Sequence, residues 1–372
     1  MYHVLLFVAL IVIEWVLCLY CANACITRLV LEDAYSLELI KKRWKKIFCV
    51  IVCAEMILFA GFRALNVGAD TAIYLDALTY YKKLPHGKIL SAKLVPPFDF
   101  EIGYFFLTKL CACLCFSSTM FLLLIATMTY IPLIIFVYKY SKNPLISLLV
   151  YFAFGFFAYS VGLFRQMIAF SICLCAVPYI REKKLIRYLL LCVFASLFHL
   201  TALIVIPFYF FEYLDIKKHK MSFLIWVVII EALCFIFARD IILEILKIFK
   251  SYAGYEGSKY DIQGGSYFNL LFLNTLLLLG LFAVVPRVDK ADTLSVKGIA
   301  VACIIQSCAY AMGIMGRLVC YYSVYGMLLI PLLSENIVKE KAVVRFMAVI
   351  ILFVWIFISL KNDMVMQNYH FF

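Results

Sequence analysis

Long apolar runs recur along the whole chain and restrict its fold more than any other feature of the sequence. Residues 223–238 and 343–360 are two of them, and each approaches the length that a helix needs to cross the hydrocarbon core of a bilayer. These runs do not alternate apolar with polar residues, as the strands of a membrane β-barrel do. The sequence therefore predicts an all-α, polytopic bundle of transmembrane helices.

The composition excludes a soluble globular protein. Of the 372 residues, 66% are hydrophobic and 15% are charged, whereas soluble domains have about 45–50% apolar and about 25% charged residues. We expect about 10–12 spans in a single integral membrane domain, residues 1–372. The candidate spans are residues 4–24, 47–62, 119–138, 144–164, 166–180, 187–211, 222–238, 267–286, 298–316, 318–333 and 343–360.

Two of the apolar segments need separate interpretation. The first run is expected to remain as a helix and not to be cleaved as a signal peptide, because no Lys or Arg precedes it and Glu14 interrupts it. Segment 101–116 is short and carries Glu101 and Lys109, which favours a re-entrant or interfacial position at the outer face.

The formal net charge of +12 comes mainly from Lys and Arg that flank the apolar runs. Orientation in the membrane and contact with lipid phosphates explain this pattern better than binding to nucleic acid does. The basic loops 41–46 and 181–184 are expected on the cytoplasmic side. This orientation leaves the long loops 63–100 and 239–266 outside, so we expect the chemistry on the outer face.

Fifteen cysteines lie in or beside the apolar runs, where we expect them to pack as small hydrophobic residues. The sequence has no glycine-rich phosphate loop, no dinucleotide-binding turn and no zinc-ligand spacing. We therefore expect neither a cofactor nor a metal ion.

The segment 61–74 is the most informative part of the first outer loop. Asp70 suits the N-cap of a helix that begins at Thr71, and Tyr74 follows Asp70 by about one helical turn. Arg63 has the donors to hold an anionic group by two contacts, and Asp70 is suited to orient a sugar hydroxyl. A capped helix beside a membrane-edge arginine would explain the same residues without a function.

Three further positions carry chemistry. Glu101 stands at the end of the first outer loop. It suits a general base or a sugar ligand, and an ordinary interfacial acid is the structural alternative. Arg165 and Gln166 stand between two apolar runs with almost no loop, where an arginine either binds an anion or extends to the interface. His199 lies in the middle of the long run 187–211, which we expect to break near this residue and turn back. Its titration near neutral pH suits a general base, and a packed histidine is the structural alternative.

Arg317, Tyr321 and Tyr325 are spaced at i, i+4 and i+8, which predicts one stripe on a single helix. Such a stripe either binds a phosphate and a sugar ring or fixes the packing of two helices. Three acids lie inside predicted spans, where acids are costly and often functional, and the sequence identifies no partner for them: Glu14, Glu55 and Glu231.

Taken together, these segments resemble the EpsG family of polysaccharide-polymerase-like membrane proteins, relatives of the Wzy polymerases. The order of these motifs and the spacing between them are similar to those of the family over most of the chain. Leu163 is a small departure, because a polar residue is expected at this position in many relatives. The matching motifs are Gly61-Phe62-Arg63, Gly68-x-Asp70-Thr71-x-x-Tyr74, Glu101-x-Gly103-Tyr104, Leu163-Phe164-Arg165-Gln166-x-Ile168-Ala169, Ala195-x-x-Phe198-His199-x-x-Ala202-Leu203, Arg317-x-x-x-Tyr321-Tyr322 and the ending Asn368-Tyr369-x-Phe371.

The resemblance implies a glycosyltransferase at the outer face of the bacterial inner (plasma) membrane. Its substrate would be an oligosaccharide repeat unit carried on undecaprenyl diphosphate, and the growing glycan would move from one lipid diphosphate onto a sugar hydroxyl of the next unit. The expected catalytic residues are His199 as general base, then Asp70 and Glu101. The expected substrate-binding residues are Arg63, Tyr74, Arg165, Gln166, Arg317 and Tyr321. The expected partners are membrane lipid, a chain-length regulator and a flippase.

Other functions remain open at this point. A flippase for the lipid-linked unit would need a large central cavity, usually built from two similar halves, and the sequence contains no repeat. A membrane acyltransferase that modifies surface glycans would also use an intramembrane histidine. A ligase that attaches finished glycan to another acceptor shares nearly all the chemistry. A structural protein would tolerate substitution of Arg63, Arg165 and His199.

Overall fold

A computed structural model describes residues 1–28, 34–89, 98, 100–248, 266–311, 313–336 and 341–371 of the chain. About 84% of the structure is helical, and the described residues contain no β-strand, only one isolated bridge between Arg63 and Phe371. The prediction of an all-α protein is confirmed.

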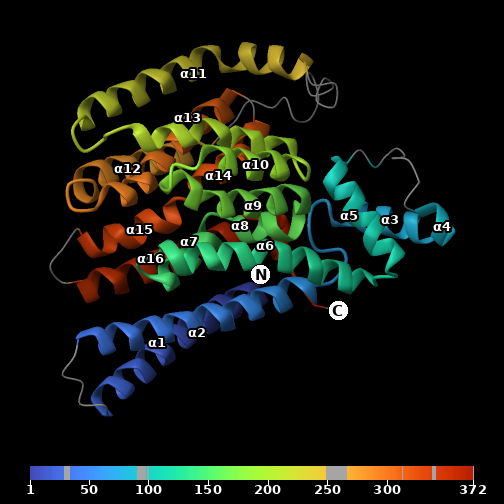
Figure 1. The fold of residues 1–372 in the computed structure, drawn as a ribbon, viewed down its shortest axis with the longest axis horizontal. Helices are drawn as coiled ribbons and strands as arrows, with labels where there is room; N and C mark the ends of the chain where they lie inside the picture. Colours follow the sequence, from blue (N-terminus) through green and yellow to red (C-terminus); the bar gives the residue numbers. More distant parts are fainter. Residues whose placement is uncertain are drawn as a thin grey trace. The chain divides into compact units, whose positions relative to one another are not determined.

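Figure 1 labels the helices α1 to α16. The α-helices are α1 (Tyr2–Arg28), α2 (Ala34–Gly61), α3 (Thr71–Lys82), α4 (His86–Ile89), α5 (Ile102–Cys113), α6 (Ser118–Tyr140), α7 (Pro144–Ala153), α8 (Phe156–Gly162), α9 (Phe164–Arg181), α10 (Leu185–Ser196), α11 (Lys220–Ile248), α12 (Tyr267–Leu279), α13 (Leu294–Ala311), α14 (Gly316–Ser323), α15 (Gly326–Asn336), α16 (Lys341–Asn362) and α17 (Met364–Gln367). The shorter or tighter helical segments are η1 (Leu200–Tyr213), the π-helical turn η3 (Gly280–Val284), η4 (Lys290–Thr293) and η5 (Gly313–Met315).

Six of the described helices are long and apolar enough to cross a membrane, and two bent pairs bring the number to eight if each pair is one span. The bent pairs are α7 with α8, at 64°, and α14 with α15, at 49°. The chain is therefore a multi-pass membrane protein. The six single helices contain the spans Tyr2–Cys25, Ser118–Tyr140, Lys220–Asp240, Tyr267–Val284, Lys290–Tyr310 and Val343–Asn362.

Two sequence-based boundaries were wrong. The basic stretch 41–46 is not a loop but part of the continuous helix α2, because Lys and Arg are good helix formers and no Gly or Pro interrupts the sequence before Gly61. The predicted outer loop 239–266 also begins too early, since α11 continues to Ile248. Most of the rest of that loop, residues 249–265, lies outside the described residues.

The chain divides into two compact units. The first consists of Met1–Tyr179, Lys184–Leu203 and Phe346–Phe372, and the second of Ile180–Lys183 and Ile204–Arg345. The single membrane domain expected from the sequence stays a prediction.

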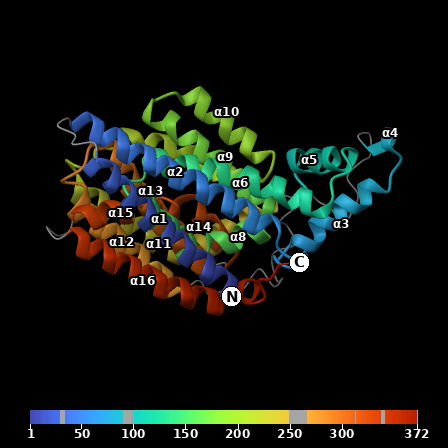
Figure 2. The same cartoon turned by 90° about the horizontal axis from the view of Figure 1, so that it is seen from below.

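In the first unit, α2 packs along α6 and against α1, while α3, α4 and α5 form a small cluster beyond the ends of α2 and α6 (Figure 2). α5 has only 12 residues, a length of roughly 18 Å at about 1.5 Å per residue. It is too short to cross about 30 Å of hydrocarbon alone, which agrees with the interfacial or re-entrant position expected for segment 101–116.

The C-terminal residues of this unit return to the end of α2. The Tyr369 hydroxyl donates to the Phe59 carbonyl (2.6 Å), and the Ala64 amide donates to the His370 carbonyl (2.9 Å). The rings of Phe59 and Tyr369 stack with centroids 5.0 Å apart. The last residues thus help to hold the turn that follows α2.

In the second unit, α13 is largely buried and contacts α11, α12 and α14. Glu231 on α11 accepts a hydrogen bond from the Asn274 amide on α12 (3.1 Å), which gives this intramembrane acid a partner. Gly298 on α13 lies directly against the ring of Tyr325, at the bend between α14 and α15. A side chain at Gly298 would collide with this ring, so the glycine permits the close packing at the bend.

We predict that Gly298→Leu lowers the thermal stability of the purified protein, because overpacking a core costs about 1–3 kcal/mol in the free energy of unfolding. Unfolding in detergent can be followed with a thiol-reactive dye that labels the buried cysteines as they become exposed. The matched control is Gly87→Leu, since a Cβ at Gly87 meets no atom within 4 Å. Equal midpoints for the two variants would contradict the packing argument.

Candidate active site around Glu101, Arg165 and His199

Glu101 joins three segments of the first unit that are distant in sequence. Its Oε2 accepts a hydrogen bond from Arg165 Nη1 (2.6 Å), and its Oε1 lies 2.7 Å from His199 Nδ1. The same Oε1 accepts from the Leu200 amide (3.3 Å). The side chains of Glu101, Arg165 and His199 are 18%, 24% and 17% exposed, so the cluster is largely buried but still accessible.

The backbone at Gly103 explains how Glu101 comes so close to His199. Glu101 precedes the first residue of α5, and the Gly103 amide donates to the Leu197 carbonyl (2.8 Å). A Cβ at Gly103 would lie only 2.7 Å from that carbonyl oxygen. The close approach of α5 to the end of α10 therefore requires glycine.

His199 occupies the break that the sequence predicts in the run 187–211. α10 ends at Ser196, and η1 begins at Leu200. A break leaves backbone amides without helical partners, and the Glu101 carboxylate satisfies one of them, that of Leu200. The same carboxylate thus stabilises the break and orients the imidazole ring.

Arg165 is the second residue of α9 and is surrounded by aromatic rings. Its guanidinium lies 5.1 Å from the centroid of Phe100 and 6.0 Å from that of Tyr74, and it hydrogen-bonds with the Tyr74 hydroxyl. Tyr74 in turn stacks on Phe164 at 4.7 Å. These contacts hold the guanidinium in one position beside Glu101.

Asp70 and Thr71 lie where the sequence predicts the start of α3, but their roles differ from the expected ones. α3 begins at Thr71, whereas the Asp70 side chain makes no capping hydrogen bond. Instead, the Thr71 hydroxyl contacts the carbonyls of Val67 (2.9 Å) and Val161 (3.1 Å). Thr71 thereby fixes α3, and with it Tyr74, against the segment that leads into Arg165.

Arg63 is only 2% exposed and lies outside this cluster. Its guanidinium donates to three backbone carbonyls, those of Val67 (3.3 Å), Val161 (2.9 Å) and Ala60. Burial lowers the pKa of Arg63 to about 10, against an opposing electrostatic effect of Tyr369 and Tyr130, so the group stays cationic at neutral pH. These contacts indicate a role in holding the loop after α2, and the anion binding expected from the sequence stays a prediction.

Three of the predicted substrate-binding residues remain: Gln166, Arg317 and Tyr321. Gln166 follows Arg165 but is buried. Arg317 and Tyr321 lie on α14 in the second unit, and their part in a site stays a prediction. The single-helix stripe was wrong, because α14 ends at Ser323 and Tyr325 lies at the bend before α15.

The sequence did not identify Phe100 or the Leu200 amide as neighbours of the cluster. Phe100 directly precedes Glu101, and this position is the one sequence signal for its place beside the cluster. The role of the Leu200 amide follows only from the position of the helix break. Among the described residues, no group of three His, Cys, Asp or Glu side chains is placed to hold a metal ion.

The charge state of Glu101 follows from its partners. Burial raises the pKa of this carboxyl, but the hydrogen bond with His199 and the positive charge of Arg165 outweigh burial and lower the pKa to about 2. Burial raises the pKa of Tyr74, against the opposing effect of Arg165. At neutral pH Glu101 is therefore an anion that only accepts hydrogen bonds, and Tyr74 keeps its proton.

An ionised Glu101 also determines the tautomer of neutral His199. Because the carboxylate accepts only, Nδ1 must carry the hydrogen of the 2.7 Å contact. The lone pair of the neutral ring then lies on Nε2. The arrangement leaves Nε2 as the atom with which His199 can take up a proton.

We predict a stability difference between the wild type and Glu101→Gln that depends on pH. The pKa of Glu101 in the folded state is about 2, below an ordinary value of about 4.3. The ion pair with Arg165 and the hydrogen bonds of the carboxylate therefore contribute fully above about pH 4.3, and this contribution is lost as the pH falls towards 2. Thermal unfolding should show a constant difference between pH 5 and 7 and a smaller one near pH 3.5. A difference that grows on acidification would contradict the assignment.

The comparisons with known proteins give one match. The model of the EpsG family matches residues 46–371, which is most of the chain. No curated protein and no solved structure matches. The match confirms the resemblance indicated by the sequence motifs, and the chain belongs to the EpsG family.

Proposed function

We propose that this chain is a polysaccharide polymerase that joins lipid-linked repeat units on the outer face of a bacterial plasma membrane. The single observation that carries the proposal is the Glu101–His199 pair beside Arg165. Membership of the EpsG family supports a function of the Wzy type. The proposed donor and acceptor are oligosaccharides on undecaprenyl diphosphate.

His199 serves as the general base. With Nδ1 held by Glu101, Nε2 accepts the proton of the acceptor hydroxyl, and the carboxylate stabilises the imidazolium that forms. Glu101 itself is a poor base, because its pKa is about 2. The proposal therefore assigns Glu101 to orientation of His199, not to proton abstraction.

Arg165 provides fixed positive charge on the side of Glu101 opposite His199. The acceptor oxygen forms a bond to the anomeric carbon of the donor glycan, and the bond from that carbon to the diphosphate oxygen breaks. The electron pair leaves with the lipid diphosphate, and the proton stays on His199. A preorganised guanidinium in a largely buried site stabilises the charge that develops on the leaving group.

The other predicted residues have supporting roles in this proposal. Tyr74 holds Arg165 by its hydrogen bond, and Arg63 fixes the loop on which α3 begins. Asp70, Gln166, Arg317 and Tyr321 are proposed to contact sugar or diphosphate. A chain-length regulator and a flippase are proposed as partners, since polymerisation outside needs a supply of units.

The function can be tested by deleting the gene and separating the lipid-linked glycans on a gel. A polymerase predicts single repeat units at the outer face and no ladder of longer products. Units trapped inside would indicate a flippase, and a normal ladder that lacks an acyl group would indicate an acyltransferase. A full ladder of lipid-linked glycan that is not passed to its final acceptor would indicate a ligase.

We predict that His199→Ala fails to restore the ladder in the deletion strain, because loss of a general base lowers a rate by about 100- to 10,000-fold. His86→Ala is the matched control, since His86 is an exposed histidine on α4. Immunoblots of membranes check that both variants are inserted equally. A normal ladder with His199→Ala would refute the assignment of the base.

We also predict that Gly103→Ala reduces polymer yield while the protein still inserts. The added methyl group would push the first turn of α5 away from the Leu197 carbonyl and lengthen the contact between Glu101 and His199. The length and amount of the ladder measure the effect, with Gly87→Ala as the control. An unchanged ladder would show that the close approach at Gly103 is not needed for activity.

A further inference from the structure

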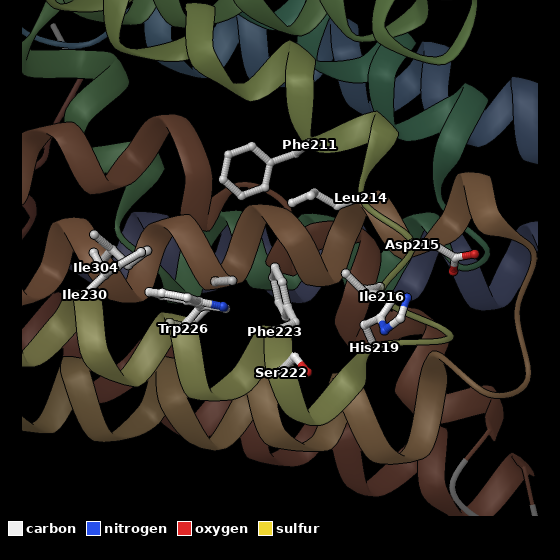
Figure 3. Close-up of a pocket in the computed structure, with 12 residues that line it drawn as sticks. Phe211, Leu214, Asp215, Ile216, His219, Ser222, Phe223, Trp226, Ile230 and Ile304 are labelled. Atoms are coloured by element: carbon white, nitrogen blue, oxygen red, sulfur yellow. The ribbon is translucent and has the colours of Figure 1, made fainter.

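An apolar groove with a volume of about 340 Å³ lies in the second unit, apart from the Glu101 cluster. Phe223 and Trp226 on α11 form one wall, and Ile304 on α13 contributes to another. Phe211 lies near the end of η1, and Leu214 is the residue after η1. Both lie opposite Phe223 and Trp226 (Figure 3). Almost all of the lining is hydrocarbon or aromatic.

The two ends of this groove differ in polarity. Asp215 and His219 lie at one end, and Ile230 and Ile304 lie at the other (Figure 3). The polar end coincides with the basic run 217–220, Lys-Lys-His-Lys, at the start of α11. The groove is basic at one end and apolar at the other, so it complements an amphiphile with a negative head group and an apolar tail.

Asp215 does not cancel the basic character of the polar end. Its Oδ1 accepts hydrogen bonds from the backbone amides of Lys217 (3.2 Å) and Lys218 (3.4 Å), so this carboxylate holds the loop. The side chains of Lys217 and Lys218 are exposed, and that of Lys220 is half-buried. Three lysines thus stand beside one aspartate.

α11 is a peripheral helix of its unit. Only 11% of its most apolar stretch is buried, and Trp226 is 63% exposed. In a helix that crosses a membrane, such an apolar surface contacts acyl chains. The positive-inside rule assigns the run 217–220 to the cytoplasmic side, where anionic lipids give the leaflet its negative potential.

We propose that this groove is a binding site for an anionic phospholipid of the membrane. One acyl chain lies along Phe223, Trp226 and Ile230, and the phosphate lies at Lys217, Lys218 and Lys220. Charge complementarity at one end and apolar lining at the other select this occupant over a zwitterionic lipid. The site is independent of the proposed polymerase reaction.

The test uses the full-length protein with Trp15, Trp44 and Trp355 replaced by Phe, which leaves Trp226 as the reporter. Its fluorescence is titrated with phosphatidylglycerol brominated in the acyl chain, and with phosphatidylcholine that has the same brominated chain. One lysine near a membrane surface strengthens the attraction of an anionic lipid about fivefold. Asp215 opposes one of the three lysines, so two such contributions remain. We therefore expect half-quenching of Trp226 at a mole fraction about 25-fold lower for phosphatidylglycerol than for phosphatidylcholine.

Replacement of the three lysines, Lys217→Gln, Lys218→Gln and Lys220→Gln, should raise that mole fraction to the value for phosphatidylcholine. The matched control is Lys41→Gln with Lys42→Gln, two exposed lysines on α2, which should leave the preference unchanged. Equal quenching by the two lipids would overturn the proposal. So would a loss of lipid preference in the control variant as large as that in the variant without Lys217, Lys218 and Lys220. Displacement of the brominated lipid by equimolar undecaprenyl phosphate would assign the groove to the polyprenyl carrier instead.

Discussion

The carboxylate of Glu101 is the contact on which the candidate site depends, because it binds a cation, an imidazole and a backbone amide at once. Removing an ionised group from water is costly unless its oxygens find hydrogen-bond partners. Here Arg165, His199 and Leu200 provide partners for both carboxylate oxygens. The contact also stabilises each partner. Arg165 gains a counter-ion, the tautomer of His199 is fixed, and the Leu200 amide at the helix break gains an acceptor.

Short helices and breaks in this protein follow the same requirement. Backbone groups in a bilayer must be satisfied within the protein, so irregular segments are tolerated only where side chains or carbonyls complete them. The turn after α2 is completed by the guanidinium of Arg63, which donates to three carbonyls. Thr71 shares two of these carbonyls, those of Val67 and Val161. Polar side chains are thus concentrated where the helices end.

Local patterns in the sequence predicted much of the fold. The apolar runs indicated an all-α membrane bundle, Thr71 was identified as the start of a helix, and the break near His199 follows from a polar residue in a long run. The errors have local causes as well. Lys and Arg at 41–46 suit a helix as well as a loop, and the spacing of Arg317, Tyr321 and Tyr325 gave no sign that the helix bends after Ser323.

The assembly of the site could not be predicted in the same way. Glu101, Arg165 and His199 are each ambiguous alone, and their meeting depends on the approach of Gly103 to Leu197, a contact between residues about ninety positions apart. No periodicity encodes such a contact. The family resemblance grouped the residues by role, but the pairing of Glu101 with His199 Nδ1 and of Arg63 with carbonyls emerged only from the structure.

The return of residues 369–371 to the end of α2 has a consequence for the order in which the chain is assembled. A chain is synthesised from its N-terminus, so α2 and the turn around Arg63 are made about three hundred residues before Tyr369 and His370. Until then the Phe59 carbonyl and the Ala64 amide lack these partners. The first unit can therefore close only after residues 369–371 have been made, long after its first helices.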